Sequence, residues 1–230
     1  MTSVSTGPGT AAGNLRGTGW MLLTGLFFVG VTGLVRHLGT DMSPIQAAFI
    51  RYAFGFVLMI PVFMRLETLR PSNGILGLYL SRGLLHGIGV SLWFFAMARI
   101  PIAEVTALGF TTPIFTTIGA ALFLNEKLRI RRIGAVLVAF GGVLFILRPG
   151  FEAVSIGAIA QVAAAPVFAG SFLIAKKLTG TESSTAIVAF LSIIVTLVLL
   201  PLAILVWRTP TITELIVLFF VAALATAGHV

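Results

Sequence analysis

The chain contains no cysteine, and only seven of its 230 residues are acidic. Without cysteine it has no disulfide, no thiolate metal ligand and no cysteine nucleophile. Charged residues make up 10% of the chain and apolar residues 58%, whereas charged residues form about 25% of an ordinary soluble domain. So few charges cannot supply the polar surface that a soluble fold of this length needs. The composition therefore predicts a protein whose solvent is the lipid bilayer.

The sequence also lacks the motifs of several function classes. It has no GxxxxGK phosphate loop and no HExxH metal motif, so we expect no cofactor, no metal site and no ATP hydrolysis by this chain. The net charge of +8 could suggest a nucleic-acid partner, but the basic residues are spread between apolar runs. That spacing is typical of the positive-inside rule, and we expect no nucleic-acid partner.

Long apolar runs predict an all-α polytopic membrane protein with about eight helices. The expected spans are residues 18–35, 45–64, 75–98, 102–124, 133–147, 156–175 and 185–207, with an eighth span that starts near Glu214. Residues 1–16 are small, polar and rich in glycine, and we expect a disordered cytoplasmic tail there.

Basic residues in the loops predict the orientation of these spans. One side receives nine: Arg16, Arg65, Arg70, Lys127, Arg129, Arg131, Arg132, Lys176 and Lys177. The other side receives four: Arg36, Arg99, Arg148 and Arg208. The richer side should be cytoplasmic, which places the N-terminus inside the cell.

The first three spans align with the sixth, seventh and eighth when the chain is laid on itself so that Gly17 meets Gly157. We call this superposition, which needs no gap, the repeat alignment. The pairs that coincide in it include Gly17/Gly157, Phe28/Phe168, Gly30/Gly170, Ser43/Ser183 and Pro61/Pro201. A repeat unit of five helices would be inverted in the membrane, as in many secondary transporters. This predicts a first repeat at 17–150 and a partial second repeat at 151–230, out of ten helices in all.

One set of residues in the second to fifth spans forms a recognisable pattern: Arg51 with Ala53, Trp93 to Ala98, Ile100 to Glu104, Pro113, Asn125 to Lys127, and Gly134, Gly141, Gly142 and Pro149. Through these residues, the stretch from Arg82 to Gly150 above all resembles the EamA domain of the drug/metabolite transporter superfamily. Members commonly have Gly-Glu where this chain has Asn125-Glu126. The resemblance implies two inverted five-helix repeats, a central substrate cavity and the movement of small metabolites without ATP hydrolysis.

The third span carries the first candidate substrate site. Arg82, His86, Gly89 and Trp93 are spaced by four, three and four residues and so share one helical face. A guanidinium suits a carboxylate or phosphate, and an indole offers a flat stacking surface. The alternative for Arg82 is a structural bond to backbone carbonyls, and for His86 a buried ring with a satisfied hydrogen bond.

Arg51 in the second span is a further candidate for the cavity. An arginine that faces lipid is costly, so Arg51 and Arg82 should both face the helix bundle. The repeat alignment places Leu191 and Ala222 opposite them. The repeat itself therefore does not require either charge.

The fourth span carries a second stripe, formed by Thr106, Phe110, Pro113 and Thr117. Pro113 removes a backbone hydrogen bond in mid-membrane, so a kink or hinge should form there. The freed carbonyls could line a polar cavity, or threonine hydroxyls could satisfy them instead. Glu104 follows Ile100-Pro101 in the first turn of the fourth span. It either stabilises the start of the helix, near the positive end of the helix dipole, or serves as a proton-coupling carboxylate.

Glycine spacing predicts close helix packing. Gly83 and Gly87 form a GxxxG face in the third span, and Gly134 and Gly141 lie one heptad apart in the fifth.

Three functions fit these features. The first is a secondary transporter of small metabolites, such as amino acids or nucleotide- or vitamin-like compounds, that works by alternating access in a bacterial inner membrane. The second is an intramembrane enzyme that acts on a lipid-linked substrate, and the third is a scaffold. The absence of a recognisable catalytic motif argues against the second and the inverted repeat against the third. A homodimer stays an open expectation.

The sequence also predicts that the reading frame continues beyond Val230 into two further apolar spans. A chain end within the eighth span would leave helix carbonyls unpaired and a carboxylate in the membrane. We therefore expect the chain that stops at Val230 to be inactive in cells, which expression with and without the continued frame would test.

The cysteine-free chain allows a direct test of the predicted orientation. Single cysteines at Ser5, Arg129 and Glu152 should differ in their reaction with an impermeant thiol reagent added to intact cells. Only the cysteine at Glu152 should react from outside. Labelling of the other two would reverse the topology.

Overall fold

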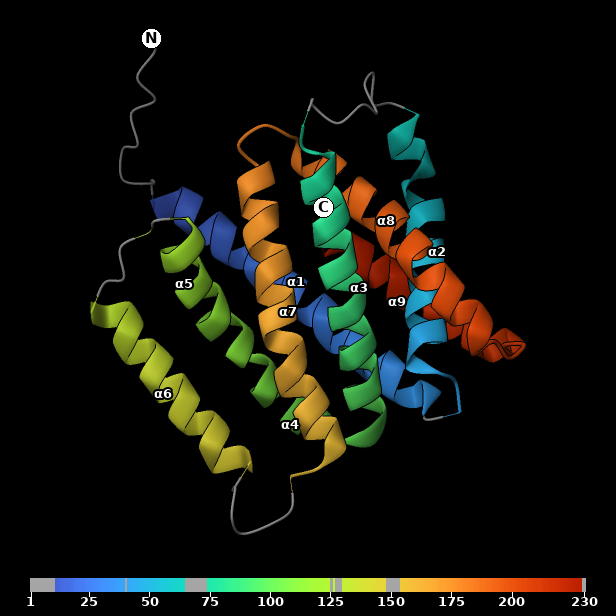
Figure 1. Ribbon diagram of the computed structural model, residues 1–230, viewed down its shortest axis with the longest axis horizontal. Coiled ribbons are helices and arrows are strands. Elements are labelled where there is room, and N and C mark those ends of the chain that lie inside the picture. Colours follow the sequence, from blue (N-terminus) through green and yellow to red (C-terminus); the bar gives the residue numbers. More distant parts are fainter. Residues whose placement is uncertain are drawn as a thin grey trace.

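The computed structural model describes residues 11–39, 41–64, 74–124, 126, 130–147 and 154–228. Within these ranges the chain forms α-helices and no β-strand. The helices are α1 (Ala11–Leu38), α2 (Pro44–Phe63), α3 (Leu76–Arg99), α4 (Ile102–Gly109), α5 (Thr111–Phe123), α6 (Ile130–Leu147), α7 (Ile156–Leu178), α8 (Ser184–Leu205) and α9 (Ile212–Ala227). This arrangement confirms the predicted all-helical fold (Figure 1).

The expected spans correspond to these helices, with one difference at the N-terminus. In the part of the chain that the structure describes, six helical segments are long and apolar enough to cross a membrane, and the apolar parts of α6 and α9 are shorter. Helix α1 begins at Ala11, so residues 11–16 are helical and not part of a disordered tail. Alanine is the strongest helix former, and Ala11 and Ala12 extend the helix beyond the apolar run. Residues 1–10 and the basic residues at 127–129 lie outside the described residues.

The fourth expected span is broken into two helices at Phe110. Helix α4 ends at Gly109 and α5 begins at Thr111, two residues before Pro113. A proline ring clashes with the carbonyl four residues earlier, here that of Gly109, and proline has no N–H to donate. The Thr111 hydroxyl donates to the Leu108 carbonyl at 2.6 Å. The predicted kink is confirmed, and a threonine satisfies one of the carbonyls beside it.

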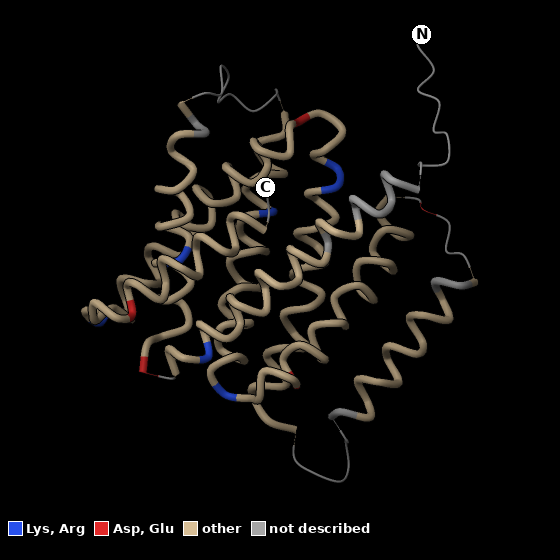
Figure 2. The backbone as a smooth tube through the Cα atoms, turned by 180° about the vertical axis from the view of Figure 1, so that it is seen from behind, with Lys and Arg blue, Asp and Glu red and all other residues tan. Residues whose placement is uncertain are grey.

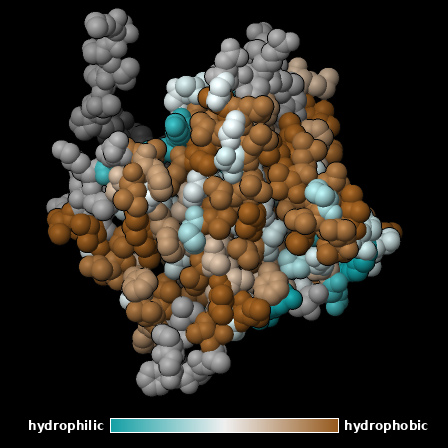
Figure 3. Space-filling model, viewed as in Figure 1, coloured by the Kyte–Doolittle hydropathy of each residue, from teal (hydrophilic) through white to brown (hydrophobic). Residues whose placement is uncertain are grey.

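The outside of the helix bundle is suited to lipid. Large apolar side chains on most helices are exposed, and the face in Figure 3 is mainly hydrophobic. Charged residues gather mainly near the two ends of the helices, with few along their length (Figure 2). A surface of this kind is stable only in a bilayer. The chain is therefore a multi-pass membrane protein.

Helix pairing follows the order that an inverted repeat would produce. Helix α3 packs extensively on α7, and α1 packs on α9. Helix α8 contacts α3, α2 contacts α9, and α2 and α8 pack on each other. Exchanging α1, α2 and α3 with α7, α8 and α9 leaves this set of pairs unchanged. In Figure 1, α3 and α7 lie side by side in the middle of the molecule, while α6 lies at its edge.

Two glycines that coincide in the repeat alignment occupy matching places in these pairs. A Cβ at Gly30 of α1 would lie 3.2 Å from a methyl group of Leu224 on α9. A Cβ at Gly170 of α7 would lie 3.1 Å from a methyl group of Leu85 on α3. Both glycines thus allow a leucine of the paired helix to approach. This match supports the repeat, whose exact boundaries stay a prediction.

The GxxxG face of α3 packs against α8. A Cβ at Gly83 would lie 2.3 Å from Cγ2 of Ile194, closer than side chains can approach. At Gly87 the nearest atom, from Leu199, would be 3.6 Å away, an ordinary contact. On α6, by contrast, a Cβ at Gly134 or Gly141 would meet no described atom within 4 Å. Close packing at those two glycines is not seen among the described residues.

We predict that Gly83→Ala destabilises the protein while Gly87→Ala is tolerated. The β-branched Ile194 cannot move aside without shifting α8, and overpacking of this kind costs about 1–3 kcal/mol. Thermal unfolding in detergent should show a lower midpoint for Gly83→Ala, with Gly87→Ala as the matched control. Equal midpoints for the two variants would contradict the close approach of α3 and α8.

Candidate functional site

A cavity of about 630 Å³ lies between α1, α2, α3, α4, α5 and α7. Both aromatic and polar side chains line its walls. The lining residues are Phe28, Arg51, Tyr52, His86, Val90, Trp93, Thr106, Gly109, Phe110, Thr112, Pro113, Thr116, Thr117, Gln161, Phe168 and Phe172. This volume is within the range of small-molecule sites in proteins.

Six of the seven residues that the sequence proposed for a substrate cavity line this one: Arg51, His86, Trp93, Thr106, Phe110 and Pro113. They come from three separate spans, which the tertiary structure brings together around one space. The seventh, Arg82, lies elsewhere.

Arg82 is not among the residues that line this cavity. It is 6% exposed and its Nη1 donates to the backbone carbonyl of Ile187 on α8 at 2.7 Å. Although it shares a helical face with His86, α8 crosses α3 near this position and covers the side chain. The alternative considered from the sequence, a bond to a backbone carbonyl, is the one that the structure has.

Arg51 is the cation that lines the cavity. It is 7% exposed, and its guanidinium carbon lies 3.9 Å from the centre of the neighbouring Tyr52 ring. A cation over an aromatic face is stabilised by the ring quadrupole, which offsets part of the cost of burial. No carboxylate occurs among the lining residues that the structure describes. The charged chemistry of the cavity wall is therefore basic.

His86 joins the cavity to the bond network behind it. Its Nδ1 lies 3.2 Å from the Ser171 hydroxyl, which donates to the Arg82 carbonyl at 3.4 Å. The serine hydroxyl thus lies between the imidazole and the backbone of α3. The His86 ring also meets Tyr52 and Phe168 edge to face, with centroids 5.9 and 5.2 Å apart. These contacts fix the ring.

Aromatic pairs form two walls of the cavity. Phe168 and Phe172 are stacked one turn apart on α7, with centroids 6.1 Å apart and planes 12° from parallel. Phe28 and Trp93 meet at 6.4 Å between α1 and α3. Flat faces of this kind bind planar rings well. Phe28 and Phe168 are one of the residue pairs that coincide in the repeat alignment.

Gln161 on α7 is a lining residue that the sequence analysis missed. It is 5% exposed, and its Oε1 has no hydrogen-bond partner among the described residues. The available signal was a single amide in an otherwise apolar part of a span. A buried polar group in a membrane helix is a reason to suspect function.

Glu104, the candidate for proton coupling, lies half-buried in the first turn of α4. It does not line the cavity. Its position at a helix start fits the dipole explanation, and the proton-coupling role stays a prediction.

A second, apolar hollow of about 800 Å³ lies between α4, α5 and α6. Thr106, Phe110, Pro113 and Thr117 line both this hollow and the aromatic cavity. The stripe predicted from the fourth span is thus a partition between the two spaces. Phe110, at the break between α4 and α5, is 65% exposed.

Comparison with known proteins identifies the family. The model of the EamA-like transporter family matches residues 15–148. The chain belongs to the EamA-like transporter family. It is 31% identical to an S-adenosylmethionine uptake transporter of Rickettsia bellii over 90% of this chain and 71% of that protein. It is 32% identical to a riboflavin transporter of Vibrio cholerae over 93% of this chain and 73% of that protein.

A third relative of this EamA-like transporter is the S-adenosylmethionine uptake transporter of Rickettsia felis. The identity is 33% over 89% of this chain and 70% of that protein. The resemblance to the drug/metabolite transporter superfamily is thereby confirmed.

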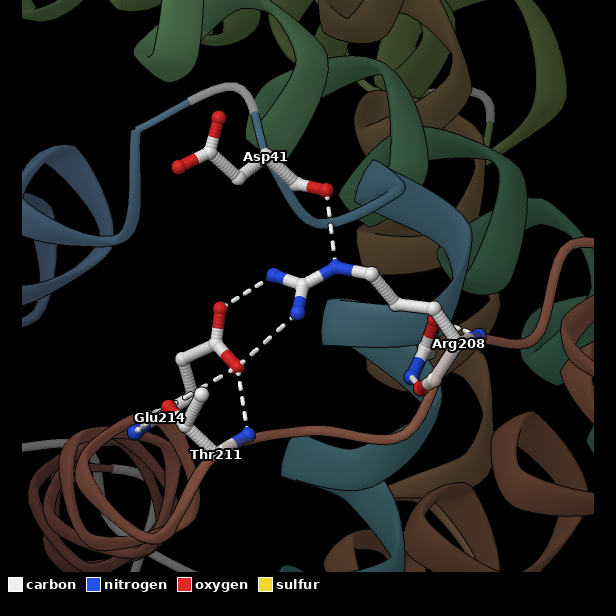
Figure 4. A network of polar contacts seen from close by, with 5 residues as sticks. Asp41, Arg208, Thr211 and Glu214 are labelled. Carbon is white, nitrogen blue, oxygen red and sulfur yellow. Dashed lines mark hydrogen bonds and ion pairs between the residues drawn. The ribbon is translucent and has the colours of Figure 1, made fainter.

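Polar contacts tie the helices of this EamA-like transporter together at one end of the bundle (Figure 4). The Arg208 guanidinium forms an ion pair with Glu214 and donates through Nε to the Asp41 carbonyl at 2.9 Å. The Gln46 amide donates to the Arg208 carbonyl at 2.6 Å and accepts from its N–H at 3.1 Å. These bonds join the start of α2 to the start of α9. We call them the Arg208 tether.

A second set of polar contacts, which we call the Glu182 tether, corresponds to the Arg208 tether in the other repeat. When the two repeats are exchanged, the starts of α2 and α9 become the starts of α8 and α3. The Tyr79 hydroxyl donates to the Glu182 carboxylate at 3.1 Å, which joins the start of α3 to the loop before α8. Lys176 also forms an ion pair with Glu126, linking the end of α7 to the segment that follows α5. Each end of the bundle thus has its own set of hydrogen bonds and ion pairs between helices.

Single cysteines in this cysteine-free chain should separate cavity positions from buried ones. We predict that Arg51→Cys and Trp93→Cys react with a small neutral thiol reagent that enters the cavity. Arg82→Cys should react at least about tenfold more slowly, because thiol reactivity follows access. Rates from mass spectrometry of the purified variants would check this, with Ser171→Cys, fully buried, as the slow control. Equal rates for Arg51→Cys and Arg82→Cys would contradict the position given to Arg82.

Proposed function

We propose that this chain is a secondary transporter that carries a small, flat, heteroaromatic metabolite across a bacterial inner membrane. The observation that carries the proposal is the lining of the cavity, whose described residues combine aromatic faces, one arginine and a buried amide without any carboxylate. Planar rings stack on Phe168, Phe172 and Trp93. Acceptor groups on the ring or its side chain are met by Arg51.

The relatives support this class of substrate. Riboflavin and S-adenosylmethionine, which name them, differ in charge but share a flat nitrogen-containing ring system. Arg51 repels a cation, so the cavity favours a neutral or anionic ring compound over the sulfonium of S-adenosylmethionine. We infer that a flavin-like or nucleoside-like compound is a better substrate than a cationic one.

Alternating access is the mechanism that we propose for this movement. The cytoplasmic N-terminus predicted from the basic residues would place the Arg208 tether on the outer side and the Glu182 tether on the inner side. Opening towards one side then requires release of the tether on that side while the other holds. The break at Phe110 provides a point where α4 can move relative to α5. Glu104, near the outer end of α4, is our candidate for coupling to protons.

The alternative, an intramembrane enzyme on a lipid-linked substrate, is less well supported. General acid–base catalysis needs a side chain that can exchange a proton, placed within hydrogen-bond reach of the reacting group. Among the described residues that line the cavity, His86 is the one imidazole and has no carboxylate beside it in the lining, and aromatic rings surround it.

Transport should be tested in vesicles that contain the protein expressed from its complete reading frame, with an imposed pH gradient. We expect riboflavin or adenosine to cross faster than in empty vesicles, and S-adenosylmethionine to cross more slowly than either. If neither ring compound exceeds the rate in empty vesicles, the proposed substrate class is wrong.

We predict that Arg51→Met raises the KM for the transported compound by about tenfold, the size of one lost hydrogen bond to a charged group. Arg99→Met is the matched control, because Arg99 lies 3.6 Å over the Phe95 ring in a similar cation–π contact but is exposed at the end of α3. Its KM should match that of the parent protein. A KM unchanged in Arg51→Met would remove Arg51 from the site.

A further inference from the structure

The two buried glutamines of the bundle differ in one respect. Gln46 is fully buried, and both ends of its amide are bonded to the backbone of Arg208. Gln161 is 5% exposed, and its buried Oε1 has no hydrogen-bond partner among the described residues. A buried amide without its bonds carries the full cost of losing water. Gln46 has a structural reason for its burial, and Gln161 needs another one.

Gln161 lies where a bound ring would meet it. It lines the cavity from α7, on the same helical face as Phe168 and Phe172, which lie seven and eleven residues further on. Its Nε2 lies close to Gly109 at the end of α4, where a Cβ would be only 3.4 Å away. The glycine leaves room for the amide beside the break in the fourth span. The amide therefore stands at the edge of the stacking surface.

We propose that the Gln161 carboxamide is the group that selects the substrate, by pairing with a ring edge on which a hydrogen-bond donor and an acceptor are adjacent. A primary amide shows one acceptor and one donor side by side in a plane, and it can bond such an edge with two parallel bonds, as glutamine does with adenine. Turning the amide over exchanges the two atoms and leaves the same kind of partner. This inference rests on the proposed function and gives it a specificity determinant.

The pairing requirement of the Gln161 amide defines the class of ligand. The imide edge of a flavin, with its N3–H between two carbonyls, and the amino edge of adenine both satisfy the requirement. Methylation at N3 of the flavin, or double methylation of the adenine amino group, removes the donor but keeps the flat ring. The stacking on Phe168 and Phe172 would be retained while the pairing with Gln161 is lost.

The test compares binding of riboflavin with 3-methylriboflavin, and of adenosine with N6,N6-dimethyladenosine, to the purified protein from its complete reading frame. We expect the parent protein to prefer an unmethylated compound by about tenfold or more. Gln161→Met, which keeps the shape but has no amide, should bind the methylated and unmethylated compounds alike. Gln46→Met should keep the preference, because Gln46 does not line the cavity.

Thermal stability provides a second readout that a merely structural role would not give. Replacing a buried amide whose oxygen has no partner among the described residues by an apolar side chain of similar shape removes an unfavourable burial. Gln161→Met should therefore unfold at the same temperature as the parent protein or higher, whereas Gln46→Met should unfold at a lower one because it breaks the Arg208 tether. A clear loss of stability in Gln161→Met would overturn the proposal.

The outcomes separate this inference from the proposed function. If the parent protein binds riboflavin or adenosine but binds the methylated partner equally well, Gln161 does not select the substrate and the proposed function stands. The same holds if Gln161→Met keeps the preference. If the parent protein binds neither compound, the proposed function fails and the inference fails with it. The measurement on the parent protein decides even if a variant does not fold.

Discussion

A polar group inside a bilayer has no water to bond to, and each one must find its partner within the protein. In this bundle most find it nearby. Thr32, Ser91 and Thr196 donate to the carbonyl four residues earlier on their own helices, and Arg82 donates to a carbonyl of a neighbouring helix. Polar residues with such bonds belong to the scaffold. Among the described residues, two buried side-chain atoms lack a hydrogen-bond partner: Nε of Arg82, whose Nη1 is bonded to α8, and Oε1 of Gln161, which lies at the cavity.

The break in the fourth span follows from the same constraint and organises the space around it. Pro113 cannot donate, so the chain turns at Phe110 and continues as a second helix. The residues at the turn then face two spaces, an aromatic cavity on one side and an apolar hollow on the other. A straight helix would present a continuous wall. The proline therefore shapes the cavity through the backbone and also lines it.

The pairing of helices is nearly symmetric, whereas the chemistry of the cavity is not. The exchange of α1–α3 with α7–α9 preserves the main contacts between these two groups of helices and the close approaches at Gly30 and Gly170. The position matched to Arg51 is Leu191, and the position matched to Gln161 is Met21. Packing at the interfaces needs small and apolar residues wherever the helices cross, so it constrains both halves alike. Side chains that face the cavity have open space on one side, so this packing constrains them less and their residue types can differ between the halves.

The sequence by itself determined the membrane class, the approximate spans, the kink at Pro113 and six of the cavity residues, because apolar length, missing backbone donors and helical spacing are local properties. The tertiary structure alone decided which polar residues share a space. Arg82 and His86 lie on one face of α3, yet the crossing of α8 covers Arg82 and leaves His86 at the cavity. In the sequence, Gln161 is only an amide within an apolar span. Its place at the cavity, beside the end of α4, is visible only in the tertiary structure. Burial and hydrogen-bond partners depend on which helices cross, and helix crossings are set by side chains far apart in the chain.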